Sequence, residues 1–187
     1  MRAIRSLAFV APAALSALIA AEAEAAVVDA ASDHFSIAVS FETQATPEAA
    51  FSALTDISLW WSPDQTSSGH AINMSLDTTP GGCLCEAWPE GLTKHAEVVQ
   101  VRFGAMVRLV GAMGPLQEMG VSEVQDLTVE PSSAGARVRW TASVKGVPSD
   151  RLQMIAPVID AMIAEQMARL QSYLATGSPE PEVVAAP

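Results

Sequence analysis

Basic residues are scarce in this chain of 187 residues: 10 lysines and arginines stand against 21 aspartates and glutamates, giving a formal net charge of −11. Such a chain is repelled by nucleic-acid phosphates and by anionic membranes. We therefore expect neither nucleic acid nor a membrane surface to be its main partner. The acidic surface most simply provides solubility.

Cysteine is also rare, with Cys83 and Cys85 alone in the sequence. With one histidine they would supply three ligands, whereas a structural zinc site needs about four. We therefore expect no metal and no cofactor. Paired cysteines are usual in an exported protein, but a bridge between residues two apart would close a tiny, strained loop. A strained bond and two free thiols remain alternatives.

Several motifs of known chemistry are missing. The sequence contains no HExxH pattern, no phosphate-binding loop and no Ser-His-Asp order, and it has no internal repeat. The chain has the length of one domain, and its 50% hydrophobic residues are ample for a core.

A long apolar run occurs only at the N-terminus, over residues 7–21. It follows Arg2 and Arg5 and precedes small-x-small cleavage sites at residues 21–23 and 23–25. The run is shorter than a comfortable membrane span of about 20 residues. We predict a cleaved signal peptide over residues 1–25, a periplasmic or secreted location, and no stable membrane insertion after cleavage. An uncleaved membrane anchor is the alternative.

The remainder reads as strands followed by one long helix. Alternating apolar residues predict a strand over 35–43, and Thr46 with Pro47 predicts a helix start. A second short helix or turn follows near 56–63. Further strands are expected at 71–76, 83–88, 93–101, 105–112, 121–130 and 137–145.

The last element carries apolar residues three and four apart over 149–176, which predicts an amphipathic helix capped by Ser149 and Gly177. A long helix after a run of strands lays its apolar face on the sheet, so the fold class is α+β with an antiparallel sheet. We expect residues 178–187 to be a disordered tail.

Several short stretches carry a family resemblance: 46–56, Leu59-Trp60-Trp61, the Pro80-Gly81-Gly82 turn running to Glu86, 95–98, 114–117, and the terminal helix. The chain resembles the START-like, or SRPBCC, superfamily over Phe35 to Gly177, as an exported member. That group includes polyketide cyclases, lipid-transfer domains and homologues of the heat-shock-ATPase activator. The resemblance implies a helix-grip domain over 34–177. Its curved sheet of six to seven strands would wrap the C-terminal helix and enclose a cavity, without fixing one chemistry.

Glu86 is the candidate catalytic residue. Leu84, Glu86 and Trp88 share one strand face, and by the resemblance Leu84 points into the cavity, so Glu86 does too. Desolvation would raise its pKa and make it a general acid or base. Alternatively Lys94, a tryptophan or a backbone donor could pair with it.

The hairpin register decides what Glu86 faces. Pairing Trp88 with Leu92 sets Glu86 opposite Lys94, and a one-residue slip sets it opposite His95. Alternation of the buried Ala96 and Val98 favours the first register and places His95 outward.

Three functional hypotheses follow. The first is an exported protein that binds a small hydrophobic or amphipathic ligand. The second is a cyclase- or hydratase-like enzyme that uses Glu86. The third is a co-chaperone-like interaction module whose protein partner is unspecified. The expected ligand-binding residues are Trp60, Trp61, His70, Leu84, Glu86, Trp88, Leu109, Trp140, Ile159 and Met162. Core packing is the alternative role for Trp60 and Trp61.

Overall fold

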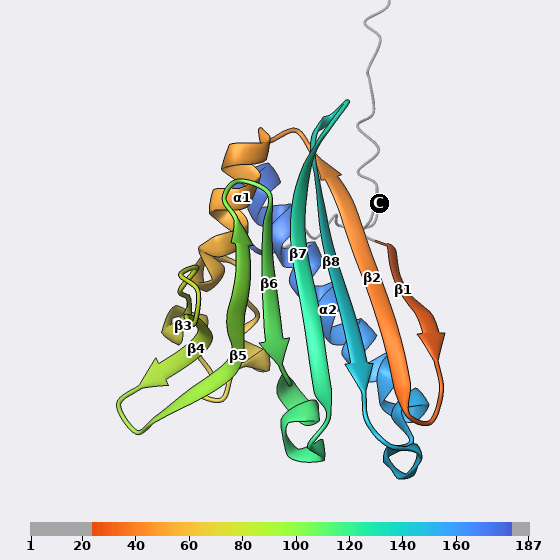
Figure 1. Ribbon diagram of the computed structural model, residues 1–187. Coiled ribbons are helices and arrows are strands. Elements are labelled where there is room, and N and C mark those ends of the chain that lie inside the picture. Colours follow the sequence, from red (N-terminus) through yellow and green to blue (C-terminus); the bar gives the residue numbers. More distant parts are fainter. Residues whose placement is uncertain (1–23, 181–187) are drawn as a thin grey trace, which may run out of the picture.

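A computed structural model describes residues 24–180 as one antiparallel sheet covered on one face by helices (Figure 1). The strands lie in the order β1-β2-β8-β7-β6-β5-β4-β3. Their bounds are β1 Glu24–Ala30, β2 His34–Thr43, β3 Met74–Leu76, β4 Cys83–Trp88, β5 Gly91–Arg102, β6 Met106–Gly111, β7 Ser122–Ser132 and β8 Gly135–Lys145.

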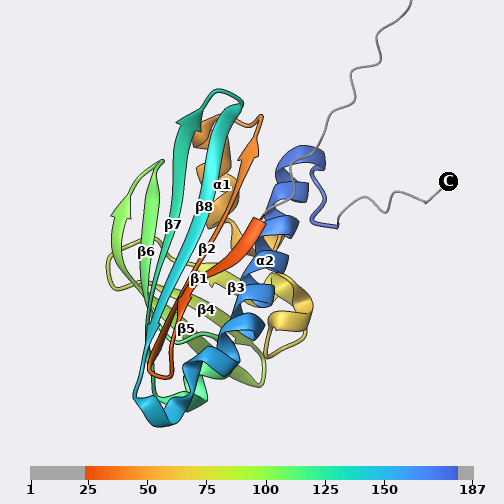
Figure 2. The same ribbon diagram turned by 90° about the vertical axis from the view of Figure 1, so that its right-hand side faces the viewer.

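Two α-helices and five short 3-10 turns complete the fold. They are α1 Pro47–Thr55, η1 Ile57–Leu59, η2 Pro63–Gln65, η3 Ala71–Asn73, η4 Gly114–Met119, η5 Pro148–Asp150 and α2 Leu152–Thr176. Seen from the side, α1 and α2 lie on the same face of a curved sheet that is not closed (Figure 2). No helix among residues 24–180 is long and apolar enough to cross a membrane.

The α+β class and the long C-terminal helix are confirmed, and the sheet has one strand more than expected. The additional strand is β1, which pairs with β2 at the sheet edge where a lead-in was expected. The predicted signal peptide lies outside the described residues up to residue 23, and its last two residues fall in β1. Residues 181–187 of the predicted tail also lie outside them, while Glu180 is held by Arg169 at 3.0 Å.

The helix ends differ from expectation at one point. Thr46 caps α1 as predicted, since its hydroxyl accepts the Ala49 N–H, and Gly177 closes α2 with φ +78°. Ser149 does not cap α2, because it lies in η5 and the helix begins at Leu152. Arg151 precedes the helix in the left-handed region at φ +53°. The Leu152 N–H then donates to the carbonyl of Ser32, which ties the helix start to the β1–β2 turn.

Alternation decides which side chains face the helices. On β2, every second residue from Phe35 to Phe41 is buried, as the sequence predicted. The strand register continues such buried positions across the sheet in rows. One row contains Leu84, Ala96, Gly111, Glu123, Val144 and Phe35. Glu123 is the only charged residue in this row, so it places one ionisable group on the face of the sheet that the helices cover.

Candidate functional site

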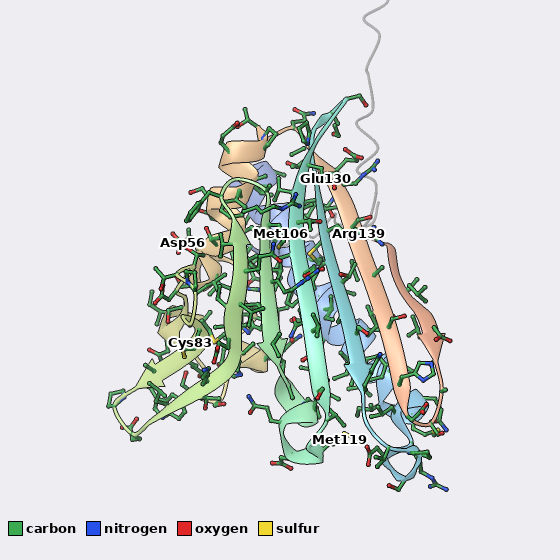
Figure 3. All side chains as sticks on the ribbon, viewed as in Figure 1. Asp56, Cys83, Met106, Met119, Glu130 and Arg139 are labelled. Atoms are coloured by element: carbon green, nitrogen blue, oxygen red, sulfur yellow. A yellow bond between two sulfur atoms is a disulfide. The ribbon has the colours of Figure 1, made fainter. Side chains whose placement is uncertain are left out.

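A pocket of about 370 Å³ lies between the covered face of the sheet and α2. Its walls come from β5, β7, β8, α2, η4 and the segment around Gln65 to Ser67. Figure 3 locates η4 by Met119, at the sheet end where β6 gives way to β7. The pocket is therefore bounded by the sheet, the helix and one short turn.

Four of the predicted ligand-binding residues line this pocket: Trp61, Trp140, Ile159 and Met162. The two indole rings lie 6.0 Å apart between centroids, and Ile159 and Met162 come from the face of α2 that meets the sheet. These side chains give the pocket its apolar wall. The spacing of apolar residues on the helix correctly indicated which face is covered.

Five other predicted residues do not line it. Trp60, Leu84 and Leu109 are fully buried core residues, and Trp60 donates its indole N–H to the Ala53 carbonyl. Trp88 lies at the end of β4 with its ring against Gly91. His70 is exposed beside η3.

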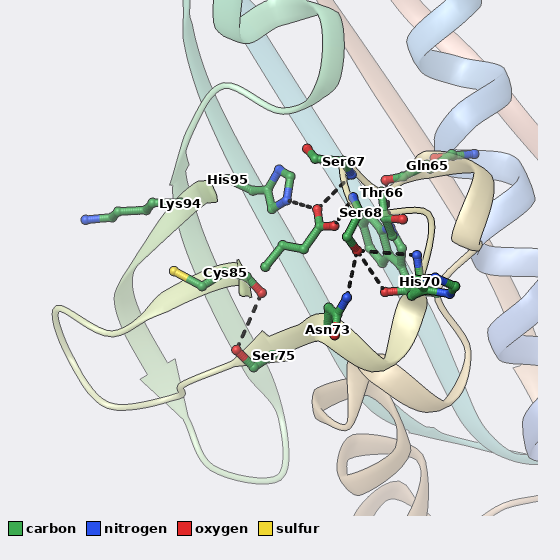
Figure 4. Close-up of polar contacts among 12 residues, drawn as sticks. Gln65, Thr66, Ser67, Ser68, His70, Asn73, Ser75, Cys85, Lys94 and His95 are labelled. Carbon is green, nitrogen blue, oxygen red and sulfur yellow. Dashed lines mark hydrogen bonds and ion pairs between the residues drawn. The ribbon is translucent and has the colours of Figure 1, made fainter. Parts of the chain in front are cut away.

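Glu86 points inward as predicted and is fully buried, but it lies behind the pocket wall rather than in it. Its carboxylate accepts the backbone N–H groups of Ser67 at 2.9 Å and Ser68 at 2.6 Å (Figure 4). The expected rise in its pKa is wrong. Burial raises the pKa, but the hydrogen bonds from Ser68, Ser67 and His95 outweigh burial and leave the pKa below its usual value. Lys94 pairs with Glu97 instead.

Both expected hairpin registers are also wrong. Trp88 pairs with Gly91 and Glu86 with Thr93. The pairing then shifts, so that Leu84 faces Ala96 while Cys85 faces Lys94. His95 is the extra residue of this β-bulge, and a bulge re-aims a side chain that simple alternation would point outward. His95 is therefore only 8% exposed, lines the pocket, and places Nε2 3.2 Å from Glu86 Oε2.

Glu123 is a pocket residue that the sequence reasoning missed. It is 1% exposed and accepts the Met113 N–H at 2.9 Å, and no basic side chain of the described residues pairs with it. Burial raises its pKa to about 7, against smaller lowering effects of the Met113 N–H and the Gln125 side chain. The missed signal was its position on the same strand face as Leu127 and Val129.

Two buried amides add polar groups that point in a fixed direction. Gln125 Oε1 accepts the Trp140 indole N–H, and Gln166 Oε1 accepts the Ser62 backbone N–H, both at 2.9 Å. Because each oxygen faces a donor, each nitrogen must be the other end of the amide. Neither Nε2 has a hydrogen-bond partner among residues 24–180, although both side chains line the pocket. The Gln166 nitrogen is therefore a buried donor without a partner beside the pocket, whereas the Gln125 amide also lies close enough to Glu123 to lower the pKa of its carboxyl group.

Cys83 and Cys85 form a disulfide, which settles the two alternatives in favour of the bond. Their Cα atoms are 5.3 Å apart, beside the bulge that re-aims His95. Across the described part of the chain, no group of histidine, cysteine, aspartate and glutamate side chains is arranged to hold a metal ion.

A curved sheet that packs against one long helix, with a pocket of apolar and polar side chains between them, defines a helix-grip protein of the SRPBCC type. The chain belongs to the family described as "Polyketide cyclase / dehydrase and lipid transport", which matches residues 34–175. The resemblance stated from the sequence is thereby confirmed. No curated protein matches the chain.

Solved structures show the same fold at low identity. A conserved protein of unknown function from Enterococcus faecalis is 10% identical with a TM-score of 0.57, covering 87% of this chain and 82% of that one. An uncharacterised protein from Rhizobium leguminosarum is 16% identical with a TM-score of 0.53, covering 83% and 99%. An Arthrobacter aurescens protein is 17% identical with a TM-score of 0.51, covering 87% and 100%.

Proposed function

We propose that this protein binds a small, largely apolar molecule with oxygen acceptors in the pocket between β7, β8 and α2. The observation that carries the proposal is the Nε2 group of Gln166, which is buried beside the pocket and has no hydrogen-bond partner among the described residues. An unpaired buried donor costs about 1–3 kcal/mol, so a ligand that supplies acceptors would recover that free energy.

The size and lining of the pocket support a small ligand. Its volume of about 370 Å³ falls near the lower end of the range of about 300–1,000 Å³ for small-molecule sites. Seven apolar side chains, including Trp61, Trp140 and Ile159, line the pocket together with nine polar ones, so the site combines apolar contact with fixed polar groups. The pocket favours ligand binding over the interaction-module alternative.

Charge narrows the ligand class. The ionisable residues that line the pocket are His95, Glu118 and Glu123, and neither lysine nor arginine is among the lining residues. An anionic ligand would meet acidic groups without a counter-charge. The ligand is therefore neutral at its polar end, with carbonyl, ether or hydroxyl oxygens as its acceptors.

A matched pair of variants tests the proposal. Ile159 lines the pocket, whereas its neighbour Val158 is 47% exposed on α2. Ile159→Trp should fill the pocket and abolish binding of an apolar fluorescent probe, while Val158→Trp should leave binding unchanged. Native mass spectrometry of the purified protein would show any bound molecule directly. Equal probe binding by both variants would contradict the proposal.

The proposed place of action is outside the cytoplasm. The disulfide between Cys83 and Cys85 supports it, because such bonds persist mainly in oxidising compartments. N-terminal sequencing of protein from cell fractions, together with thiol alkylation before lysis, tests this. Cytoplasmic protein with an intact N-terminus and two alkylated cysteines would contradict it.

A further inference from the structure

His95 is held with one ring nitrogen free. Glu86 is fully buried, and its lowered pKa keeps it ionised, so it accepts hydrogen bonds only. The His95 Nε2 that faces it therefore donates the hydrogen bond. Nδ1 makes no hydrogen bond to a residue within 24–180, and Figure 4 shows it pointing away from the Glu86 carboxylate. Because Nδ1 has no partner on a ring that Glu86 holds in place, His95 is a candidate base.

Glu123 lies two strands away from His95 on the sheet. The register places Ala96, Gly111 and Glu123 side by side on β5, β6 and β7, with His95 adjacent to Ala96. Two strand spacings separate β5 from β7, roughly 10 Å. Gly111 contributes no side chain, and the small Ala96 packs against it. Both side chains line the same pocket and can meet one ligand from opposite sides.

We propose that His95 and Glu123 transfer protons to and from a bound small ketone, with His95 as the base, Glu123 as the acid and Glu86 as the residue that positions His95. The inference rests on the proposed ligand binding and adds a reaction to it. The substrate class is an apolar ketone with a second oxygen, which accepts a hydrogen bond from Gln166.

The step balances without a co-reactant. A C–H bond next to the ketone breaks, and its proton goes to His95 Nδ1. The electron pair forms a C=C bond while the C=O π pair moves to oxygen, which takes the proton of the Glu123 carboxyl group. The products are an enol, an imidazolium stabilised by Glu86, and a Glu123 carboxylate. Return of the proton from His95 to the same or another carbon, together with return of the enol O–H proton to Glu123, regenerates both side chains.

Proton exchange into a model ketone tests the inference without knowledge of the natural substrate. In D2O, NMR would follow deuterium entering 2-tetralone next to its carbonyl, while quenching of tryptophan fluorescence reports binding beside Trp61 and Trp140. We expect protein-catalysed exchange that falls about 100-fold in His95→Gln and in Glu123→Gln, within the usual range for general acid–base catalysis. His70→Gln is the matched control, because His70 is exposed outside the pocket and should exchange like the original protein.

The split between binding and exchange separates positioning from mere support of the fold. The ionisable groups that face the ligand are His95, Glu118 and Glu123, with Glu86 behind His95. The exchange rate should fall as pH rises through about 7, where Glu123 loses its proton. Glu86→Gln replaces the carboxylate that orients the His95 ring, and should lower the exchange rate while 2-tetralone binding stays unchanged. A purely structural role would lower binding and exchange together.

The outcomes are distinguishable. Bound 2-tetralone that exchanges no faster than in buffer overturns the reaction and leaves ligand binding standing. Exchange that survives both His95→Gln and Glu123→Gln, in variants whose circular dichroism shows them folded, also overturns it. A protein that neither quenches nor exchanges overturns the reaction together with the proposed pocket function.

Discussion

Two buried carboxylates on the same face of one sheet have opposite charge behaviour. Glu86, on β4, is completely buried, yet its pKa is lowered, whereas Glu123, on β7, is 1% exposed with a pKa raised to about 7. Both depth and donors differ: Glu86 lies in a less deeply buried position and meets two backbone N–H groups, the Ser68 side chain and an imidazole, while Glu123 lies deep in the protein and meets one backbone N–H and a nearby amide. Depth of burial and the number of fixed donors together decide which carboxyl group is ionised.

Removing the carboxylate of Glu86, which accepts more hydrogen bonds, should have the largest effect on the free energy of unfolding. Glu86→Ala leaves the N–H groups of Ser67 and Ser68 without their acceptor, and we expect a loss of about 3–5 kcal/mol in the free energy of unfolding. Urea denaturation at pH 7 measures it. Since the pKa of Glu86 is lowered, its stabilisation is present above the unfolded-state pKa and is lost as pH falls through the folded value. A loss below 1 kcal/mol would contradict the stabilisation that we assign to the Glu86 hydrogen bonds.

Removing the carboxyl group of Glu123, which has fewer donors, should instead increase the free energy of unfolding at neutral pH. The folded protein binds the Glu123 proton more tightly than the unfolded chain, so this contribution is full below about pH 4.5 and is lost as pH rises to about 7. The shift corresponds to about 3 kcal/mol. Glu123→Gln should therefore gain about 3 kcal/mol relative to the original protein between pH 4.5 and pH 8. Parallel stability curves for the two proteins would contradict this.

The disulfide should matter less for stability than for local order. A loop of about three residues gives only about 1.5 kcal/mol in the chain-entropy description. Cys83→Ser with Cys85→Ser should thus lower the urea midpoint slightly, while hydrogen exchange of Cys85 to His95 amides increases, because the bond lies beside the bulge. Unchanged exchange there would show that the bulge forms independently of the bond.

The smallest expected effect is a change in one pKa. Gln125 lowers the pKa of Glu123, so Gln125→Leu should raise that pKa further, by less than about one unit. NMR of the Glu123 side-chain carboxyl carbon follows the titration directly. A fall in the pKa would mean that water takes the place of the amide and solvates the carboxylate better.

Much of the fold could be predicted because periodicity and end signals are local. The strand from Phe35, the Thr46 cap and the Gly177 stop all follow from neighbouring residues. The sheet register could not be predicted, because a single inserted residue at His95 reverses which side chains are buried. Edge strand β1 was missed because its pairing partner, rather than its own pattern, orders it.

The site was predictable only in its apolar part. Ile159 and Met162 follow from the apolar spacing of the helix, whereas Trp61 was expected either at the ligand entrance or in the packing of the short helices. Glu123 and Gln125 share a strand face with Leu127. Polar residues near the end of a strand, however, usually indicate positions that are exposed to solvent. Only the turn η4, which covers them, makes them buried. Their chemistry depends on tertiary contacts that local patterns do not contain.

The pairing of β2 with β8 also sets an order of events during folding. Residues 34–43 of β2 pair with residues 136–145 of β8, so β2 is synthesised about a hundred residues before the strand with which it pairs. Helix α2, which covers the apolar sheet face, is synthesised later still. Contacts of such long sequence separation form slowly. A nascent chain therefore presents uncovered strands to its surroundings, and shielding by chaperones would govern its yield more than the stability of the finished domain.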